Sequence, residues 1–299
     1  MAALPEEADV VVIGGGIVGA SVAYFTRKSG IERVVLIDRG LFGSGSSSRA
    51  AGGVRQQFST EVNVRLSQKS LAFYRRFEQE LGIDAGFRQS GYLFLLTDGR
   101  AWKAFQRSAI MQRDLGVPTR LLDRAGAQEL VPQLVVDDVL GATYCPTDGF
   151  ADPGSAVEGF VTGARAAGVV CRDETAVIGI QLGDGRVAAV QTAAGSVRTP
   201  VVVNCAGAFA ASIGHMVGLE LPVLPYRRQI FVTEPFDDLP EEMPLTVDFG
   251  TKFYCRREGR AVLMGMDDPK EPSGEDTATT VAFLERLIEA ATRRIPALA

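Results

Sequence analysis

The sequence predicts an α/β protein, α+β overall, in which a Rossmann-like nucleotide-binding domain with a β-meander is interleaved with a smaller antiparallel-sheet domain. Three observations predict this fold class. An apolar run at 9–13 leads into a glycine-rich turn and an alanine-rich helical pattern, a second apolar run follows at 33–37, and strand-like and helical segments alternate through the rest of the 299 residues. A chain of this length can hold two medium-sized domains.

The first apolar run breaks into G-x-G-x-x-G at Gly14, Gly16 and Gly19. The first glycine makes the turn, the second lets the backbone approach a ligand, and the third allows close helix–strand packing, so that a helix N-terminus faces a diphosphate. The pattern is weak by itself because such turns also serve as plain connections. Asp38 supports it, since this carboxylate ends the second strand where a ribose hydroxyl needs an acceptor.

The stretch at 43–55 combines small residues and serine hydroxyls with Arg49 and Arg55. A flexible linker is the alternative, but linkers rarely stand between the second strand of a nucleotide fold and a strong helix. Small residues let backbone N–H groups reach an extended ligand, and an arginine adds a charge-assisted contact to phosphate. The turn alone fits NAD and FAD equally, and this loop favours FAD.

Periodicity and capping signals predict the later elements. The first part of the chain is predicted to contain an amphipathic helix at 59–81, a strand at 91–97, helices at 101–115 and 123–130, and a return from this insert near 148–149. A helix at 152–168, a strand at 169–173, a meander at 175–199, a buried strand at 200–204 and another helix should follow. The last part is predicted to hold strands at 226–233, 252–255 and 261–265 and a helix at 277–294.

The chain resembles the superfamily of FAD-dependent oxidoreductases that includes glycine oxidase, sarcosine oxidase and D-amino-acid oxidase. The resemblance is closest to the sarcosine oxidase beta subunit, dimethylglycine dehydrogenase and related assembly flavoproteins. It covers essentially the whole chain and is carried by VVIGGGIVGASVAYFTRKSG, GSGSSSRAAGGVRQQF, DGFADPGSAVEGFVTGARAAGV, VVVNCAGAFAASIGHMVGLELPVLPYRRQIFVTEP and FYCRREGRAVLMGMDDP.

The resemblance implies an FAD-binding domain at 1–85 and 145–220 and a substrate domain at 86–144 and 221–299. Members of the family continue beyond the position of residue 299, so we expect the C-terminal part of the family fold to be missing. The cofactor-binding positions implied are Gly14, Gly16, Ile17, Val18, Gly19, Asp38, Arg39, Ser47, Ser48, Arg49, Ala51, Gly52, Gly53, Val177, Ala206 and Gly207. Arg49 replaces a histidine that tethers FAD in dimethylglycine-dehydrogenase-like members, so we expect non-covalent FAD.

The resemblance further implies oxidation of the C–N bond of an amino acid or N-methylated amino acid, such as sarcosine, dimethylglycine or glycine, by hydride transfer to the flavin. Arg55 is the expected partner of the substrate carboxylate, because a guanidinium fork stays charged and binds it in two places. Strand alternation allows only one of Phe253 and Tyr254 to face the pocket, and Tyr254 is the candidate. His215 is expected to be a solvated helix residue.

Two other function classes stay open. A non-catalytic assembly flavoprotein would use the same fold to serve a partner, and a nicotinamide-dependent dehydrogenase would use the same glycine turn. An oligomer or an electron-acceptor protein is a further possible partner.

Charge and cysteine spacing narrow the function classes. A net charge of −5 argues against nucleic-acid binding, and no apolar run is long enough to span a bilayer. The four cysteines show no C-x-x-C spacing, so neither a metal site nor a disulfide framework is predicted. The start of the chain at 1–7 is short and acidic, unlike a signal or transit peptide, and this predicts a cytoplasmic protein.

Overall fold

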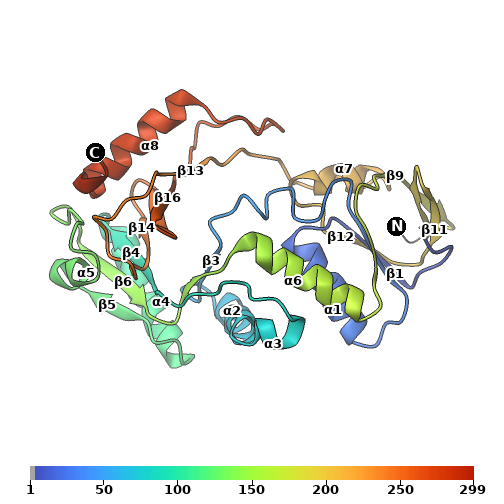
Figure 1. The fold of residues 1–299 in the computed structure, drawn as a ribbon, viewed down its shortest axis with the longest axis horizontal. Helices are drawn as coiled ribbons and strands as arrows, with labels where there is room; N and C mark the ends of the chain where they lie inside the picture. Colours follow the sequence, from blue (N-terminus) through green and yellow to red (C-terminus); the bar gives the residue numbers. More distant parts are fainter. Residues whose placement is uncertain (1–3) are drawn as a thin grey trace.

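A computed structural model describes residues 4–299; residues 1–3, where the predicted FAD-binding domain and the acidic start of the chain begin, lie outside the described residues. The molecule has two halves that lie side by side along its longest axis (Figure 1). One half contains a four-stranded parallel sheet and a three-stranded meander, and the other contains a seven-stranded sheet. No helix within residues 4–299 is long and apolar enough to cross a membrane.

The parallel sheet is the centre of three layers. Its strand order is β12 (Val202–Asn204), β1 (Val10–Ile13), β2 (Val34–Ile37) and β8 (Val170–Arg172). Helices α1 (Ile17–Lys28) and α6 (Pro153–Ala166) pack on one face, and the meander β9 (Val177–Gly183), β10 (Arg186–Thr192) and β11 (Gly195–Arg198) packs on the other. Alternate strand residues therefore enter two separate cores, as the continuous apolar runs require.

The second sheet is antiparallel except at one strand pair. Its order is β13 (Ile230–Val232), β16 (Ala261–Gly265), β15 (Tyr254–Glu258), β14 (Leu245–Asp248), β4 (Tyr92–Leu96), β6 (Gly141–Cys145) and β5 (Arg120–Leu122). Strands β14 and β4 are parallel. Helices α5 (Arg124–Leu130) and α8 (Val281–Arg294) share an apolar core with one face of this sheet. The opposite face turns toward the middle of the molecule.

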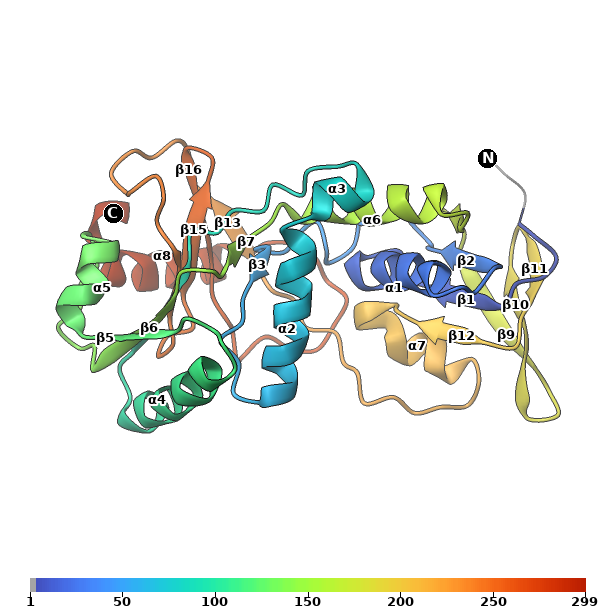
Figure 2. The same cartoon turned by 90° about the horizontal axis from the view of Figure 1, so that it is seen from below.

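Short elements join the two halves. Helices α2 (Glu61–Tyr74) and α3 (Phe77–Leu81) lie near the middle, where the two-residue strands β3 (Gly53–Val54) and β7 (Gly149–Phe150) pair antiparallel (Figure 2). Helix α4 (Gly99–Asp114) lies beside the seven-stranded sheet, and the short helices η1 (Gly207–Phe209), α7 (Ala210–His215) and η2 (Pro296–Leu298) complete the chain. The predicted domain boundaries stay a proposal, which the separate cores of the two halves support.

Several predicted boundaries were wrong for local reasons. The helix at 59–81 breaks after Tyr74, and α8 begins at Val281 rather than at 277. The strand expected at 252–255 begins at Tyr254, because the Asp248 carboxylate accepts hydrogen bonds from Gly250 and Thr251 and closes a turn there. The strand expected to be buried at 200–204 is a half-buried edge strand.

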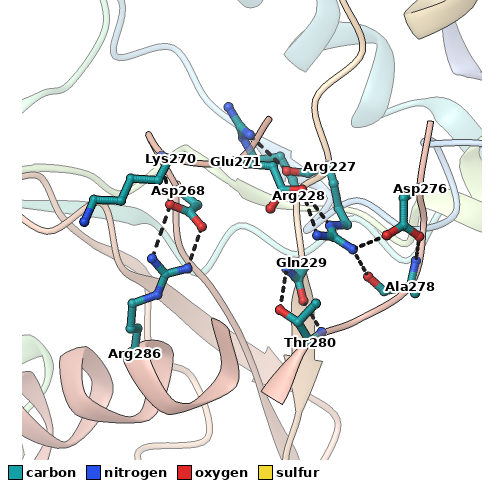
Figure 3. Close-up of polar contacts among 10 residues, drawn as sticks. All are labelled: Arg227, Arg228, Gln229, Asp268, Lys270, Glu271, Asp276, Ala278, Thr280 and Arg286. Carbon is teal, nitrogen blue, oxygen red and sulfur yellow. Dashed lines mark hydrogen bonds and ion pairs between the residues drawn. The ribbon is translucent and has the colours of Figure 1, made fainter. Parts of the chain in front are cut away.

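The strand expected at 226–233 shrinks to β13, because the residues before it bind a later loop instead of a neighbouring strand. The Arg227 guanidinium forms ion pairs with Glu271 and Asp276, and the Gln229 carboxamide exchanges hydrogen bonds with Thr280 (Figure 3). Both side chains are well buried, so these contacts fix the chain between β16 and α8 against the segment that enters β13.

Candidate nucleotide and substrate site

The glycine turn has the tight geometry that its sequence predicts. Gly14 has φ of +108°, and a Cβ atom there would lie 2.3 Å from the Cys205 carbonyl oxygen. A Cβ atom on Gly19 would lie 1.7 Å from the Gly14 carbonyl oxygen. Only glycine therefore fits these two positions, and the turn brings the N-terminus of α1 beside the carboxyl ends of β1 and β12.

The serine-rich loop folds over the start of α1. The Ser47 hydroxyl accepts a hydrogen bond from the Ile17 N–H (2.9 Å), and a Cβ atom on Gly16 would lie 2.9 Å from the same oxygen. The Ser48 hydroxyl donates to the Gly43 carbonyl (2.7 Å), and this closes the loop. A hydroxyl and the N–H groups of the first helical turn thus meet where an anion binds best. Val18 and Arg49 are exposed beside them.

Asp38 connects the glycine turn to the end of β2. Its two carboxylate oxygens accept hydrogen bonds from the N–H groups of Gly15 (2.6 Å) and Gly40 (2.8 Å). The next residue, Arg39, places its guanidinium 3.8 Å from the centroid of the Phe209 ring in η1. Asp38 and Arg39 therefore stand at the same end of the parallel sheet as the turn.

The far wall of this crevice is less closely packed. Ala206 and Gly207 follow β12, and a Cβ atom on Gly207 would meet no atom within 4 Å. Val177, at the start of β9, packs partly buried in the core between the meander and the parallel sheet. A role for Val177 in adenine binding would therefore involve its backbone, and it stays a proposal.

The segment that follows the loop crosses to the other half of the molecule. The Ala51 carbonyl accepts a hydrogen bond from Arg256 Nε in β15 (2.7 Å). Gly52 has φ of +70°, and a Cβ atom there would lie 2.1 Å from the Ala151 carbonyl oxygen. Gly53 pairs with Phe150, and a Cβ atom on it would lie 3.2 Å from the Tyr92 ring. The small residues predicted to face the cofactor thus lie between the two sheets.

Arg55 lies directly beyond this crossing. Its guanidinium is 4.6 Å from the Phe58 ring centroid and 5.4 Å from that of Phe94 in β4. The side chain is half-buried, and it has no carboxylate within 4 Å among residues 4–299. Two aromatic rings hold the guanidinium by cation–π contact and leave its N–H groups available to an anion.

Two tyrosines stand on the same face of the seven-stranded sheet. Strand register puts Tyr254, Val247 and Phe94 in one row across this face, with Tyr92 two residues from Phe94 along β4. Burial raises the pKa of Tyr254 to about 12, and burial likewise raises the pKa of Tyr92, against the opposing charge of Arg55. Both phenols are therefore neutral hydrogen-bond donors at neutral pH.

The alternation of β15 separates the two aromatic candidates. Phe253 has no exposed surface and packs in the core beneath the sheet, whereas the Tyr254 ring lies over Gly265 on the opposite face. His215 is exposed on α7, 3.3 Å from Glu220.

Three residues that shape this region were not predicted from the sequence: Tyr92, Asp148 and Arg256. Arg256 could have been found by alternation, because it stands two residues after Tyr254 on the same strand face. Asp148 has no such signal, since its contacts depend on how 56–57 and 147–148 meet in the fold.

The arrangement fits FAD. The α1 N-terminus and the Ser47 hydroxyl suit its diphosphate, Asp38 suits a ribose hydroxyl, and open space beside Gly207 leaves room along the crevice. The strands of the parallel sheet point toward the middle of the molecule, where β3 lies (Figure 2).

Comparisons with known proteins agree with this geometry. A family model described as FAD dependent oxidoreductase, the DAO family, matches residues 9–299. Mitochondrial sarcosine dehydrogenase of Mus musculus is 32% identical over 310 residues, which cover 99% of this chain and 34% of that protein. The mitochondrial pyruvate dehydrogenase phosphatase regulatory subunit of Mus musculus is 30% identical over 266 residues, which cover 88% of this chain and 30% of that protein.

Among solved structures, L-proline dehydrogenase from P. horikoshii has a TM-score of 0.91 and 35% sequence identity, and the match covers 99% of this chain and 79% of that chain. The present chain spans about a third of the length of the two curated relatives.

Proposed function

The chain belongs to the DAO family of FAD dependent oxidoreductases, and on this premise we propose that it oxidises the C–N bond of an amino acid or an N-methylated amino acid. Sarcosine and proline are the first substrates to test, since they are named by a relative and by a solved neighbour. Dimethylglycine and glycine are the next.

The half-buried guanidinium of Arg55 is the observation that carries the proposal. It has no carboxylate within 4 Å among the described residues, and it lies two residues beyond the Gly53 end of the segment proposed to hold the cofactor. A desolvated guanidinium binds a carboxylate in two places, and this contact fixes the orientation of an amino acid. Arg55 thus suits the substrate carboxylate.

Neighbouring groups would complete the binding of substrate. The neutral phenols of Tyr92 and Tyr254 can donate hydrogen bonds, while Phe94 and Val247 keep this face of the sheet apolar and exclude water. FAD held by the glycine turn, Asp38, Ser47 and the segment after Arg49 would supply the acceptor for a hydride from the carbon next to nitrogen. No side chain of the chain is required to accept that hydride.

Turnover assays test this function directly. The purified protein, supplied with FAD and an artificial electron acceptor, should oxidise sarcosine or proline and show flavin absorbance after removal of free cofactor. Absence of turnover with bound flavin, together with a co-purifying partner, would favour the non-catalytic assembly role. Binding of NADH without flavin would favour the nicotinamide alternative.

Replacement of Arg55 by alanine tests the carboxylate contact. We expect Arg55→Ala to raise KM for sarcosine about 100-fold, because a charge-assisted bidentate contact contributes about 2–3 kcal/mol. Oxidation of dimethylamine, which lacks a carboxylate, should change little. Arg107→Ala, at an exposed arginine on α4, serves as the control. An unchanged KM for sarcosine in Arg55→Ala would remove this residue from the role.

A further inference from the structure

Asp148 is a buried carboxylate that the proposed chemistry does not use. Its side chain has no exposed surface. It has no cation within 4 Å among the described residues, although a buried carboxylate normally needs a charged partner. Burial raises its pKa, and hydrogen bonds from Gln56 and Gln57 oppose that rise. Burial of a carboxylate without a cation lowers the stability of the fold, so we expect Asp148 to have a specific role.

Three hydrogen bonds join the Asp148 carboxylate to the two residues that follow Arg55, and the Cys145 thiol is a further partner. Oδ1 accepts hydrogen bonds from the Gln56 N–H (2.9 Å) and from Gln56 Nε2 (3.1 Å), and Oδ2 accepts one from Gln57 Nε2 (3.3 Å). Gln57 Nε2 also donates to the Tyr92 carbonyl (2.9 Å). Because the partners are N–H donors and one thiol, which is also a donor, the site is built for an ionised acceptor.

The chain before Arg55 is fixed as well. Val54 pairs with Gly149 and Gly53 with Phe150, so the next positions along the two strands are Arg55 and Asp148. The backbone of Arg55 is thus held by a strand pair on one side and by the Asp148 carboxylate on the other. With the backbone held, the guanidinium can move only by rotation about the side-chain bonds of Arg55, and it lies near the rings of Phe58 and Phe94.

We propose that Asp148 is a positioning residue that sets the place of the Arg55 guanidinium for the substrate carboxylate, acting through Gln56 and Gln57. The proposal rests on the proposed function of Arg55. Loss of the Asp148 carboxylate should therefore affect KM rather than the chemical step. Release of residues 56–57 would move only the Arg55 guanidinium, which binds the carboxylate of the substrate.

A double-mutant cycle with Asp148→Asn and Arg55→Ala tests this coupling. In the wild-type background, Asp148→Asn should raise KM for sarcosine about 10-fold with kcat changed less than about twofold. In the Arg55→Ala background, the same substitution should have no further effect on KM. Asp268→Asn, which removes another buried carboxylate paired with Arg286, controls for general loss of stability. An equal rise in KM in both backgrounds would overturn the proposal.

A second variant and a second readout keep the test independent of folding and turnover. Gln56→Met removes one hydrogen bond to Asp148 and should raise KM in the same direction by a smaller factor. The dissociation constant of acetate, measured by NMR titration of the protein with FAD, should rise in Asp148→Asn and in Arg55→Ala alike. If only Arg55→Ala weakens acetate binding, Asp148 has no positioning role even though the proposed function stands. If acetate binds independently of Arg55, both proposals fail.

Discussion

At the scale of single residues, the candidate site brings together charged side chains whose burial costs free energy. Arg55 and Asp148 both act on the Tyr92 phenol, one lowering and the other raising its pKa, while burial is the largest influence. Arg256 is 3% exposed, yet its guanidinium lies 4.3 Å from the Phe150 ring centroid and reaches the Ala51 carbonyl. The buried charge of Arg256 therefore holds the Ala51 end of the segment that crosses between the sheets.

Tyr254 predicts a loss of stability at alkaline pH. Its pKa is raised by burial to about 12 in the folded protein, so its contribution to stability is complete below pH 10 and is lost as pH rises toward 12. We expect the free energy of unfolding of Tyr254→Phe to fall less over this range than that of the wild type, by up to about 2 kcal/mol. Urea unfolding at several pH values measures the difference, with Tyr226→Phe, at a half-exposed tyrosine, as the control. Parallel pH curves for wild type and Tyr254→Phe would contradict this assignment.

At the scale of elements, the contact between α1 and β1 depends on a missing side chain. A methyl group on Gly19 would lie 1.7 Å from the Gly14 carbonyl oxygen, so α1 would have to move away from the strand end. We expect Gly19→Ala to cost more than about 3 kcal/mol of unfolding free energy and to weaken FAD binding. Gly99→Ala, at the start of α4 where a Cβ atom meets nothing within 4 Å, should change stability by less than about 1 kcal/mol. Similar unfolding free energies for the two variants would show that the turn is not rigid.

Helix α8 is fixed at its end by a buried ion pair. The Arg294 guanidinium donates to Asp248 Oδ2 (2.8 and 3.0 Å) and to the Asp138 carboxylate (2.8 and 3.1 Å). Arg294→Met would leave the buried Asp248 carboxylate without its cationic partner, and we expect a loss of about 3–5 kcal/mol in urea unfolding. The hydrogen bond from Arg294 lowers the pKa of Asp138, so its contribution is present at neutral pH and is lost as pH falls below the usual range of a carboxyl. The double variant Arg294→Met with Asp248→Leu should recover part of the loss; a double variant no more stable than Arg294→Met would argue against the buried charge as its cause.

Elements whose signal is local could be predicted from the sequence, and those that depend on distant contacts could not. The glycine turn, β16 and the helix capped by Asp152 lie where the sequence predicts them, because their determinants are neighbours in the chain. Strands β5, β6 and β14 were missed, since each is defined by its partner strands elsewhere in the chain. Helix α2 was predicted as part of a longer helix, and two of its apolar residues, Val62 and Leu66, are exposed.

The same distinction applies to the site. The spacing of glycines, small residues and Asp38 predicts a dinucleotide crevice, and the structure brings these residues to one end of the parallel sheet. The contact between Arg256 and Ala51 joins positions 205 residues apart, so no local pattern could reveal it. Arg55 was predicted from its place in a resembled loop, whereas its aromatic neighbours come from the fold.

At the scale of the whole molecule, the cofactor should be held without a covalent bond. Arg49 is an arginine, whose guanidinium is exposed and forms no tether of the kind a histidine provides. We expect acid or heat to release all the FAD, leaving no visible absorbance on the precipitated protein. Added FAD should also raise Tm, because a ligand that binds only the folded state stabilises it by mass action. A chromophore that stays with the denatured chain would contradict non-covalent binding.

The parallel pairing of β14 with β4 also has a consequence for how the protein is made. Strand β4 emerges from the ribosome early, but its neighbour begins at Leu245. Until then the edge of β4 that faces away from β6 has no partner strand and can pair with other chains. Contacts so distant in the sequence form slowly, so the nascent protein should depend on chaperones during this interval and should aggregate if translation stops before the last third is complete.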